Sequence, residues 1–585
     1  MEYLRQRTQV FFFCVQKRVW NYLNWKLRYL GVLMTAAVVW GNHAEASVLV
    51  PGMPDAGTLT REQQERDLTH PEDEVNRASI AAPEKERPNL TMPDEVKIQV
   101  KGFKISGQDI YSDDVLQALV AEYNGKMVTF KDLQAGADKI TAYFRNHGYL
   151  MARCYIPAQK ISGGIVEYAI LVGRLDKVEI DNKTKIHESA LKREIGFLKP
   201  GDYLTRQKLE RAVWLLSDLA GAEAKATLAT GQQTGTVTVK IELSGHQGKC
   251  GLLSADNYGN RYTGYYSYGL SYDILNPARE GDQLALAGNT TGSQLYNYGL
   301  NYILPAGRDG LRLTFGYNKL SYKLGDVYER LDACGTSRSA SFGMEYAIKR
   351  SQMHNLYAGL RYEYNNLEDE IRLYGSSIPK HSNGMVLSLY GDDLSGRGAF
   401  SWRVDYKWGN LAFENDAGRR RGQISQTSGT FHKLRFNLMQ QQRLTNRLNL
   451  ILTARGQLAS SNLDSSEHFS LGGASGVRAY PASEASGDIG YLLRGELRYA
   501  LPSQGKNQWQ LAAFLDHGGV QINKHDDGMS DNERFLQGAG LGVIYSRRDE
   551  FFLRADYAWI LGAAKPQSDT SSPRGRFWLR GGLYF

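Results

Sequence analysis

The sequence predicts a transmembrane β-barrel of sixteen antiparallel strands over residues 247–585, preceded by two small α+β modules and a short N-terminal helix. Two observations predict the barrel. Apolar and polar side chains alternate along many consecutive stretches of this region, as in strands with one apolar and one polar face. The chain is also rich in tyrosine (35) and glycine (61), which are typical of strands, interface girdles and tight barrels.

The stretch 491–501 shows the alternation clearly. Leucines share one of its faces, and the charged side chains of Arg494, Glu496 and Arg498 share the other. A soluble sandwich would put the apolar face in a core, but the strands predicted here are long, closely repeated and unsupported by helices. An apolar outside around a charged inside is the outer-membrane pattern, because lipid cannot satisfy charges or open sheet edges.

Sixteen candidate strands can be counted, an even number as in single-chain outer-membrane barrels. Such a barrel encloses a lumen wide enough for an aqueous channel. The last strand ends at Phe585, and a terminal aromatic residue on the lipid face is the usual ending of these barrels. The candidate strands span about residues 248–259, 263–275, 282–291, 293–305, 310–324, 337–351, 354–369, 381–394, 398–411, 427–444, 448–461, 490–501, 508–522, 535–549, 551–561 and 574–585.

Residues 1–46 are typical of a signal peptide rather than of the folded protein. Six basic side chains precede an apolar core at residues 30–40, and Ala44-Glu45-Ala46 supplies a cleavage site, so we expect the mature chain to begin at Ser47. The alternative is an uncleaved inner-membrane anchor. Cleavage removes six basic and two acidic residues, which lowers the formal net charge from +8 to +4, too little to imply nucleic-acid binding.

Three cysteines remain in the mature chain, because Cys14 leaves with the signal peptide. Cys154, Cys250 and Cys334 are widely spaced, and the sequence contains no C-x-x-C metal pattern. A Cys154–Cys250 bridge could form in the periplasm, but three unrelated thiols are favoured. The eleven histidines are scattered, and we expect no metal site and no cofactor.

The segment 47–70 begins irregularly and then predicts a helix of unusual polarity at residues 58–70. Thr60 and Gln63 have the spacing of a capping box, and the residues that follow favour a helix but are almost wholly polar. Such a helix cannot bury itself in an apolar core, so it lies either in a water-filled lumen or in solvent, and composition alone favours solvent. Residues 71–95 are rich in Pro and Glu and predict a linker.

Residues 96–173 and 174–246 have the same predicted element order, β-α-α-β-β, which indicates an internal repeat. The exposed sheet edges of such modules can capture an extended peptide by strand addition, although both modules could also be spacers. We expect strands at 96–100, 151–157, 164–172, 175–180, 222–229 and 235–243, and helices at 113–120, 130–144, 187–198 and 205–219.

The longest interval between predicted strands, 462–489, is rich in glycine and carries Arg478 between Val477 and Ala479. Two strands further on, the alternation places Asp516 on the lumen face. If the loop folds inward, Arg478 can pair with Asp516, because a planar guanidinium binds a carboxylate through two parallel hydrogen bonds. An arginine in a loop is otherwise more often solvated.

Together these features resemble the outer-membrane transporters of two-partner secretion, the TpsB family, over essentially the whole mature chain. The long loop of that family carries a Val-Arg-Gly-Tyr/Phe motif, matched here by Val477-Arg478-Ala479-Tyr480. Ala479 stands where the family usually has glycine, which reaches positive φ more cheaply than alanine. The family's Phe-x-Asp-x-Gly strand motif matches Phe514, Asp516 and Gly518. The first barrel strands and the second-module helix also resemble the family, at residues 256–264 and 209–221.

The resemblance implies a signal peptide (1–46), an N-terminal segment with a plug helix (47–70), a linker (71–95), two POTRA domains (96–173 and 174–246) and a sixteen-stranded barrel (247–585). It implies that the polar helix occupies the pore at rest and that Arg478 and Asp516 form an inward salt bridge. It also implies that Phe585 is a C-terminal assembly signal.

The function implied by the resemblance is export and not catalysis. The POTRA domains, in the periplasm, would bind a large TpsA-type secreted protein such as a haemolysin, adhesin or toxin, which would cross the outer membrane unfolded and without ATP. Outer-membrane lipid and the barrel-assembly machinery are the other expected partners, and nucleic acid is not. The alternatives are a barrel-assembly factor of the same superfamily, a porin, which lacks POTRA modules, and an enzyme, for which no catalytic motif was found.

Overall fold

The computed structural model describes residues 53–67, 80–81, 97–245, 249–503, 505–525, 531–548, 550–569, 571–572 and 574–585. The predicted signal peptide lies outside the described residues, as does the predicted linker except for Ile80 and Ala81. No helix in the described part of the chain is both long enough and apolar enough to span a membrane.

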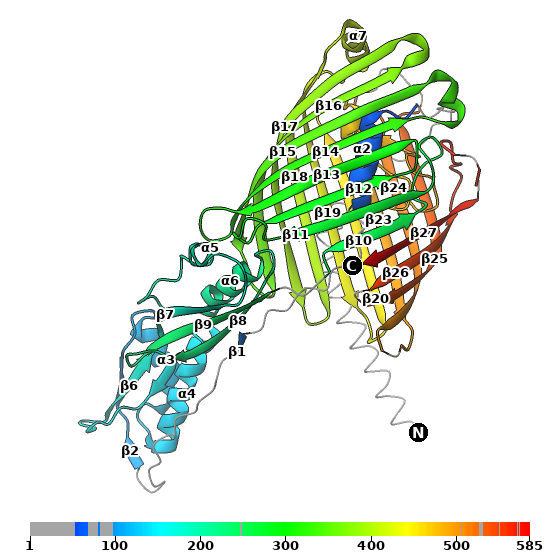
Figure 1. The fold of residues 1–585 in the computed structure, drawn as a ribbon. Coiled ribbons are helices and arrows are strands. Elements are labelled where there is room, and N and C mark those ends of the chain that lie inside the picture. The colour runs from blue at the N-terminus through cyan, green and yellow to red at the C-terminus, as the bar shows by residue number, and fades with distance from the viewer. Residues whose placement is uncertain are drawn as a thin grey trace, which may run out of the picture. The chain divides into compact units, whose positions relative to one another are not determined.

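Sixteen antiparallel strands of the described chain close into a barrel, which confirms the predicted fold class (Figure 1). The first strand, β10, closes the barrel against the last, β27, with Leu252 opposite Tyr584 and Asp256 opposite Arg580. The strands are β10 (Gly251–Asp256), β11 (Ser267–Leu275), β12 (Gln283–Thr290), β13 (Leu295–Pro305), β14 (Leu311–Lys323), β15 (Ala333–Lys349), β16 (His354–Ile371), β17 (Ser376–Ser395), β18 (Gly398–Phe413), β19 (Gly429–Arg443), β20 (Leu448–Ala459), β23 (Ile489–Ala500), β24 (Asn507–Gln521), β25 (Glu533–Arg547), β26 (Phe551–Ile560) and β27 (Gly575–Tyr584).

Each predicted interval overlaps one of these strands, but some strand ends differ. β17 begins at Ser376 rather than at 381, and β15 begins at Ala333 rather than at 337. The backbone ladder continues there, with Ser376 opposite Ile371, although the residues are mostly small or polar and do not alternate. Beyond the lipid layer both faces of a strand meet water, so the pattern that revealed the membrane-spanning part is lost.

The alternation separates an apolar outer face of the barrel from a polar inner one. Leucines that are more than half exposed lie on strands around the barrel, among them Leu253, Leu387 and Leu515. Charged residues of other barrel strands are buried inside, among them Lys407 on β18 and Glu496 on β23. The outer face suits lipid and the inner face suits a water-filled lumen.

Short elements lie in the loops that connect the barrel strands. They are η2 (Asp326–Leu331), η3 (Arg372–Tyr374), α7 (Asp416–Ile424), η4 (Ser465–Glu467), β21 (Phe469–Ser470) and β22 (Ser486–Gly487). The last three belong to the long segment between β20 and β23, where β21 pairs with β22. This segment is the one that the sequence singles out by its length and glycine content.

The first α+β module differs in detail from its predicted order. The predicted order missed β3 and β4, which are only five and three residues long, too short for alternation to show. The sheet order is β3-β6-β5, and β2 pairs with β4, so β5 is an edge strand. The elements are β2 (Lys97–Gln99), β3 (Gly102–Ser106), α3 (Asp113–Val120), η1 (Ala121–Tyr123), β4 (Met127–Thr129), α4 (Phe130–Asn146), β5 (Arg153–Tyr155) and β6 (Ile165–Leu171).

The second module has the predicted order, β-α-α-β-β. Its first helix ends at Glu194 and not at 198, shortly before Gly196, a poor helix former. A two-residue strand from the predicted linker, β1 (Ile80–Ala81), pairs in parallel with β8 and extends the sheet to the order β1-β8-β9-β7. The module's own elements are β7 (Arg174–Asn182), α5 (Glu188–Glu194), α6 (Arg206–Ser217), β8 (Ala222–Thr230) and β9 (Thr236–Gly245).

The three described cysteines are free thiols, and Cys154 and Cys334 are buried. The alternative Cys154–Cys250 bridge is therefore not formed. Burial in the core of the first module raises the pKa of the Cys154 thiol to about 12. A buried thiol with a raised pKa carries little thiolate and is a poor nucleophile.

Glu194, at the end of α5, is a buried carboxyl that is expected to make the second module less stable as the pH rises. It is 3% exposed, and its Oε1 has no hydrogen-bond partner among the described residues. Burial raises the pKa of Glu194 from 4.5 to about 7. Because the folded-state pKa is raised, the protonated form is favoured by folding, and stability falls as the pH rises toward and through that value.

Between pH 6 and pH 8 this linkage predicts a loss of about 1.4 kcal/mol, which is roughly a tenfold fall in hydrogen-exchange protection. Hydrogen exchange of the α5 amides in the full-length protein, corrected for intrinsic rates, measures it. Glu194→Gln should remove the pH dependence. Equal pH dependence in both proteins would contradict the assignment to Glu194.

Candidate functional site: the inward loop and the plug helix

The long segment between β20 and β23 folds back against the inner surface of the barrel. We call residues 460–488 the inward loop. Val477, Ala479 and Tyr480 at its tip are each 0% exposed, and they pack in one cluster with Phe514 of β24. The Val-Arg-Ala-Tyr segment and the Phe-x-Asp-x-Gly strand, which lie far apart in sequence, therefore meet inside the barrel.

Arg478 binds the carboxylate of Asp516 in a bidentate pair. Its Nη2 and Nε atoms lie 2.7 and 2.8 Å from the two carboxylate oxygens. Its backbone N–H donates to Asp516 Oδ2 at 3.1 Å, and its guanidinium lies 3.3 Å from the ring centroid of Phe514. Arg478 is 1% exposed and Asp516 is 2% exposed. This geometry is the one that makes arginine the specific cation for a carboxylate.

Glu496 of β23 is a second acceptor for Arg478, which sequence reasoning missed. Arg478 Nη1 lies 2.5 Å from Glu496 Oε2, and Arg554 of β26 donates to the same oxygen at 2.9 Å. The alternation does place Glu496 on the lumen face. The alternation does not show how far along the barrel axis a residue lies, however, and it is this position that brings Glu496 beside the loop tip.

Glycines in the barrel wall make room for the tip of the inward loop. A Cβ atom at Gly538 would lie 2.6 Å from the Cβ atom of Ala479, and one at Gly518 would lie 2.3 Å from Leu471 Cδ1. Ala479 is not among the described residues with positive φ, so the glycine that is usual at this position is not needed for the backbone. Gly518 of the strand motif is needed for close approach of the loop.

Two aromatic side chains fix the loop tip further. The hydroxyl of Tyr480 donates to the backbone oxygen of Ala564 at 2.8 Å. The indole Nε1 of Trp578, on β27, donates to the backbone oxygen of Arg478 at 2.6 Å. The tip is thus held by strands β23 to β27, on the side of the barrel that closes against β10.

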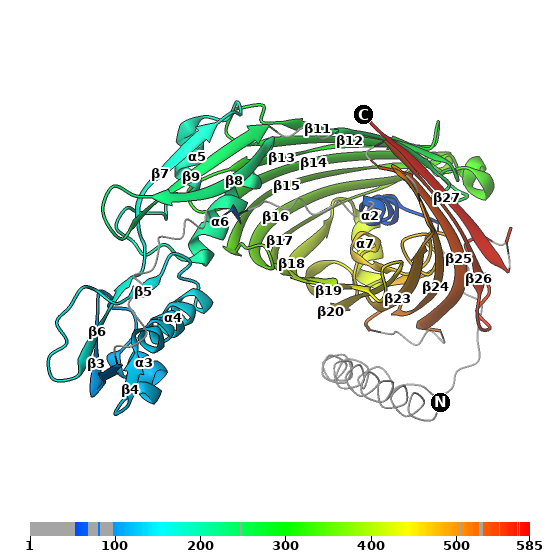
Figure 2. The same ribbon diagram turned by 90° about the horizontal axis from the view of Figure 1, so that it is seen from below.

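The N-terminal helix, α2 (Ala56–Asp67), lies inside the ring of barrel strands (Figure 2). The prediction that Thr60 caps this helix is wrong. Asp55 caps it instead and accepts from the N–H of Thr58 at 2.9 Å, so the helix begins four residues before Thr60. The lumen position agrees with the resemblance and not with the solvated position that composition alone favours.

The plug helix carries a small apolar anchor that its composition conceals. Ala56 and Leu59 are each 0% exposed, and they pack against an apolar patch on the lumen wall that includes Leu320, Tyr322 and Leu367. A single leucine among polar residues gives no recognisable stripe, so sequence reasoning missed it. Full burial of one leucine contributes about 2 kcal/mol to the seating of the helix.

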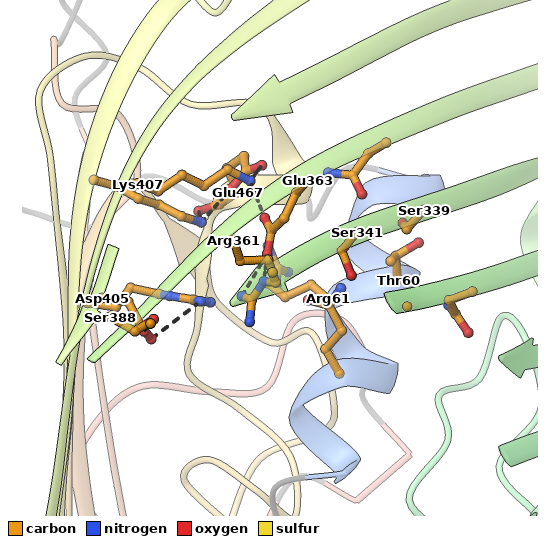
Figure 3. Close-up of a pocket in the computed structure, with 18 of the residues that line it drawn as sticks. Thr60, Arg61, Ser339, Ser341, Arg361, Glu363, Ser388, Asp405, Lys407 and Glu467 are labelled. Carbon is orange, nitrogen blue, oxygen red and sulfur yellow. Dashed lines mark hydrogen bonds and ion pairs between the residues drawn. The ribbon is translucent and has the colours of Figure 1, made fainter. Parts of the chain in front are cut away.

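Polar contacts seat the rest of the helix. Arg61 Nη1 donates to the backbone oxygen of Ser465 at 2.6 Å, and Asn289 Nδ2 donates to Gln63 Oε1 at 2.5 Å. A cavity of about 730 Å³ lies beside the helix and is lined by Thr60, Arg61 and polar residues of β13 to β20 (Figure 3). The helix thus fills only part of the lumen.

The base of the inward loop is also bound to the wall by buried ion pairs. Glu467 Oε1 lies 2.6 Å from Lys407 Nζ, and Glu467 Oε2 lies 2.5 Å from Lys433 Nζ. Lys407 also lies 3.0 Å from Glu363, and these side chains face the cavity together (Figure 3). No cluster with the ligand types and number of a metal site occurs among the described residues.

Phe585, the last residue, lies at the seam of the barrel. Its ring stacks on Tyr272 with centroids 6.1 Å apart and is 50% exposed. Its backbone N–H donates to Gly251 O at 3.0 Å, where a Cβ atom would lie 2.4 Å from the ring. The aromatic terminus is thus on the outer face, as the alternation predicts.

Three family models match the chain. The model described as haemolysin secretion/activation protein ShlB/FhaC/HecB matches residues 235–545, which is more than half of the chain. A POTRA domain of ShlB type matches residues 98–173, and a POTRA model described as surface antigen variable number repeat matches residues 173–244.

Similar proteins and structures point the same way. The chain is 26% identical over 568 residues to the heme/hemopexin transporter protein HuxB of Haemophilus influenzae, covering 95% of this chain and 99% of that protein. It is 24% identical over 463 residues to the outer membrane transporter CdiB of Escherichia coli, covering 76% of each. The structure of CdiB from Escherichia coli matches with a TM-score of 0.71 at 19% identity, over 92% of this chain and all of that one.

CdiB from Acinetobacter baumannii matches with a TM-score of 0.63 at 20% identity, over 93% of this chain and 100% of that one. At such identities these likenesses concern the fold, and it is the family model that shows membership. With POTRA domains ahead of a closed outer-membrane barrel, this chain belongs to the haemolysin secretion/activation protein family, the TpsB transporters of two-partner secretion, which act in the outer membrane with their POTRA domains in the periplasm.

Proposed function

We propose that this transporter recognises a large TpsA-type protein through its POTRA domains and exports it unfolded through the barrel lumen, without ATP. The observation that carries the proposal is a sixteen-stranded lumen that holds two non-covalently seated parts, the plug helix and the inward loop. Hydrogen bonds such as Asn289 to Gln63 can be exchanged for bonds to water or to a passing chain at little net cost.

Strand addition is the proposed mode of recognition. β8 of the second POTRA domain already accepts a parallel strand from the chain itself, β1, so this edge is geometrically competent to bind an extended peptide. β5 is an edge strand of the first POTRA domain. Main-chain hydrogen bonds at such edges give affinity with little demand on side-chain sequence, which suits a long unfolded substrate.

Arg478 and Asp516 are proposed to hold the inward loop at rest, with Val477, Ala479, Tyr480, Phe514 and Gly518 forming their packed surroundings. Phe585 is proposed as the signal read by the barrel-assembly machinery, with outer-membrane lipid as its surroundings in the assembled barrel. The role is transport and not catalysis. The partner would be a haemolysin, adhesin or toxin, and its folding outside the cell would drive export.

Reconstitution of secretion tests the proposal. The chain is expressed in a laboratory Gram-negative host with a candidate partner, a very large, repeat-rich secreted protein encoded next to it. The partner should reach the medium only when this chain is present. A partner without its N-terminal domain, or a chain without residues 97–245, should leave the partner in the periplasm.

A barrel-assembly factor is the remaining alternative, and the same strains discriminate it. Loss of this chain should leave the outer-membrane levels of other barrel proteins unchanged. If those levels fall, or if the intact partner stays in the periplasm beside an inserted wild-type barrel, the export function is overturned.

A further inference from the structure

Lys380 of β17 is a buried ammonium group shared by three separate parts of the protein. It is 4% exposed. Its Nζ lies 2.8 Å from Asp464 of the inward loop, 3.6 Å from Asp55 at the start of the plug helix and 3.8 Å from Asp369 of β16.

The first turn of the plug helix is bound at the same place. The N–H of Ala56 donates to Asp369 Oδ1 at 2.7 Å, where the positive end of the helix dipole also favours a carboxylate. Asp55 accepts a hydrogen bond from the hydroxyl of Ser465 in the inward loop. A Cβ atom at Gly57 would lie 2.5 Å from Ser466 N. The plug therefore rests directly on the base of the inward loop.

We infer that Lys380 is a positioning residue that holds both the plug helix and the inward loop at one point of the barrel wall. We also infer that the plug helix is released before the inward loop. This inference rests on the proposed export function, because only export requires the plug to leave. Lys380 lies nearer to Asp464 than to Asp55, so it keeps a close partner in the loop when the plug departs.

The balance of charge favours release of the plug over release of the loop. Three carboxylates share one ammonium in the cluster, so departure of Asp55 removes repulsion from Asp369 and Asp464. The loop has further ion pairs at Glu467 and Arg478 that do not involve the plug. Elsewhere the described part of the plug is held by the apolar contacts of Leu59 and by hydrogen bonds with Ser465, Asn260 and Asn289.

The test compares two readouts in the purified full-length protein. Single-channel recording in planar bilayers reports departure of the plug, and hydrogen exchange at residues 463–467 reports loosening of the loop base. Lys380→Met, which keeps the buried stem and removes the charge, should raise both the opening frequency and the exchange rate at least about tenfold. Asp55→Asn should raise the opening frequency alone. Lys380→Arg should behave as the wild type.

Lys407→Met is the matched control, because Lys407 is a buried wall lysine that pairs with the loop at Glu467 and makes no ion pair with the plug among the described residues. It should loosen the loop base more than it opens the channel. The inference is overturned if Lys380→Met leaves the opening frequency unchanged, or if Asp55→Asn loosens the loop as much as Lys380→Met does.

Failure of this inference is distinguishable from failure of the proposed function. If the wild type secretes its partner and Lys380→Met opens no more often than the wild type, only the role of Lys380 is lost. If the two readouts respond as expected but the wild type secretes no partner, the export function is lost, and Lys380 still registers the plug and loop.

Discussion

Replacing Arg478 by alanine is expected to cut secretion of the partner by at least about tenfold while the barrel still inserts into the outer membrane. The change leaves Asp516 and Glu496 buried without the guanidinium that joins them. Removing one member of a buried ion pair typically costs about 3–5 kcal/mol, enough to displace the inward loop from its resting position. The measurement is immunoblotting of the partner in medium and cells, with a heat-modifiability assay of the folded barrel.

Arg420→Ala supplies the control, because Arg420 lies on the exposed face of α7 and bonds only to a backbone oxygen of its own helix among the described residues. It should secrete normally. Arg478→Lys should be intermediate, since an ammonium keeps the charge but not the bidentate geometry. Unchanged secretion in both Arg478→Ala and Asp516→Ala would remove the pair from the mechanism.

A charge reversal tests whether Glu496 takes part in the interaction between Arg478 and Asp516. If Arg478 and Asp516 acted alone, the double variant Arg478→Asp with Asp516→Arg would recover much of the secretion. Because Glu496 lies 2.5 Å from the guanidinium of Arg478, the new aspartate would face a second carboxylate. We therefore expect the reversal to fail, and to improve when Glu496 is also changed to Gln.

Deleting the plug helix, residues 56–67, is expected to raise the mean conductance of the purified channel several-fold. The helix lies in the lumen, and the cavity beside it is only about 730 Å³. Planar-bilayer recording measures the effect. A channel that stays closed after the deletion would show that the inward loop alone seals the lumen, and the plug role would then be lost.

Leu59→Ala is a milder version of the same change. Truncation of a fully buried leucine costs about 2–5 kcal/mol, so the plug should leave the lumen at least roughly thirtyfold more often, without loss of the barrel. Gln64→Ala, at an exposed position on the same helix, is the matched control and should open as rarely as the wild type. Equal opening frequencies in the two variants would contradict the anchoring role of Leu59.

The barrel was predictable because the outer face of each strand must be apolar where it contacts lipid. This requirement produces an apolar residue at every second position of the sequence. Arg478 and Asp516 were predictable as partners only by assuming that the loop folds inward. Where strands run beyond the lipid, as at the start of β17, no such requirement acts and the prediction stopped short. Lys380 lies in that same stretch, which is why nothing in the sequence singled it out.

Some residues were not predicted because their role depends on their position along the barrel axis or on a single contact. Glu496 shares its face with Arg494 and Arg498, and periodicity cannot rank three positions along one strand. Leu59 is one apolar residue in a polar helix, and Asp55 precedes the segment that looked helical. Each of these gains its role from the facing wall, which is built from strands hundreds of residues away.

The fit of Ala479 against Gly538 restricts how the loop and the wall can change. A methyl group on Gly538 would collide with the one on Ala479, whereas Ala479→Gly would merely leave a methyl-sized void at a cost of about 1 kcal/mol. The two positions therefore share the space of a single methyl group. If this loop were grafted onto a barrel with a larger residue at the position of Gly538, its tip would clash with the wall. The clash would remain even if the loop arginine could still pair with a carboxylate.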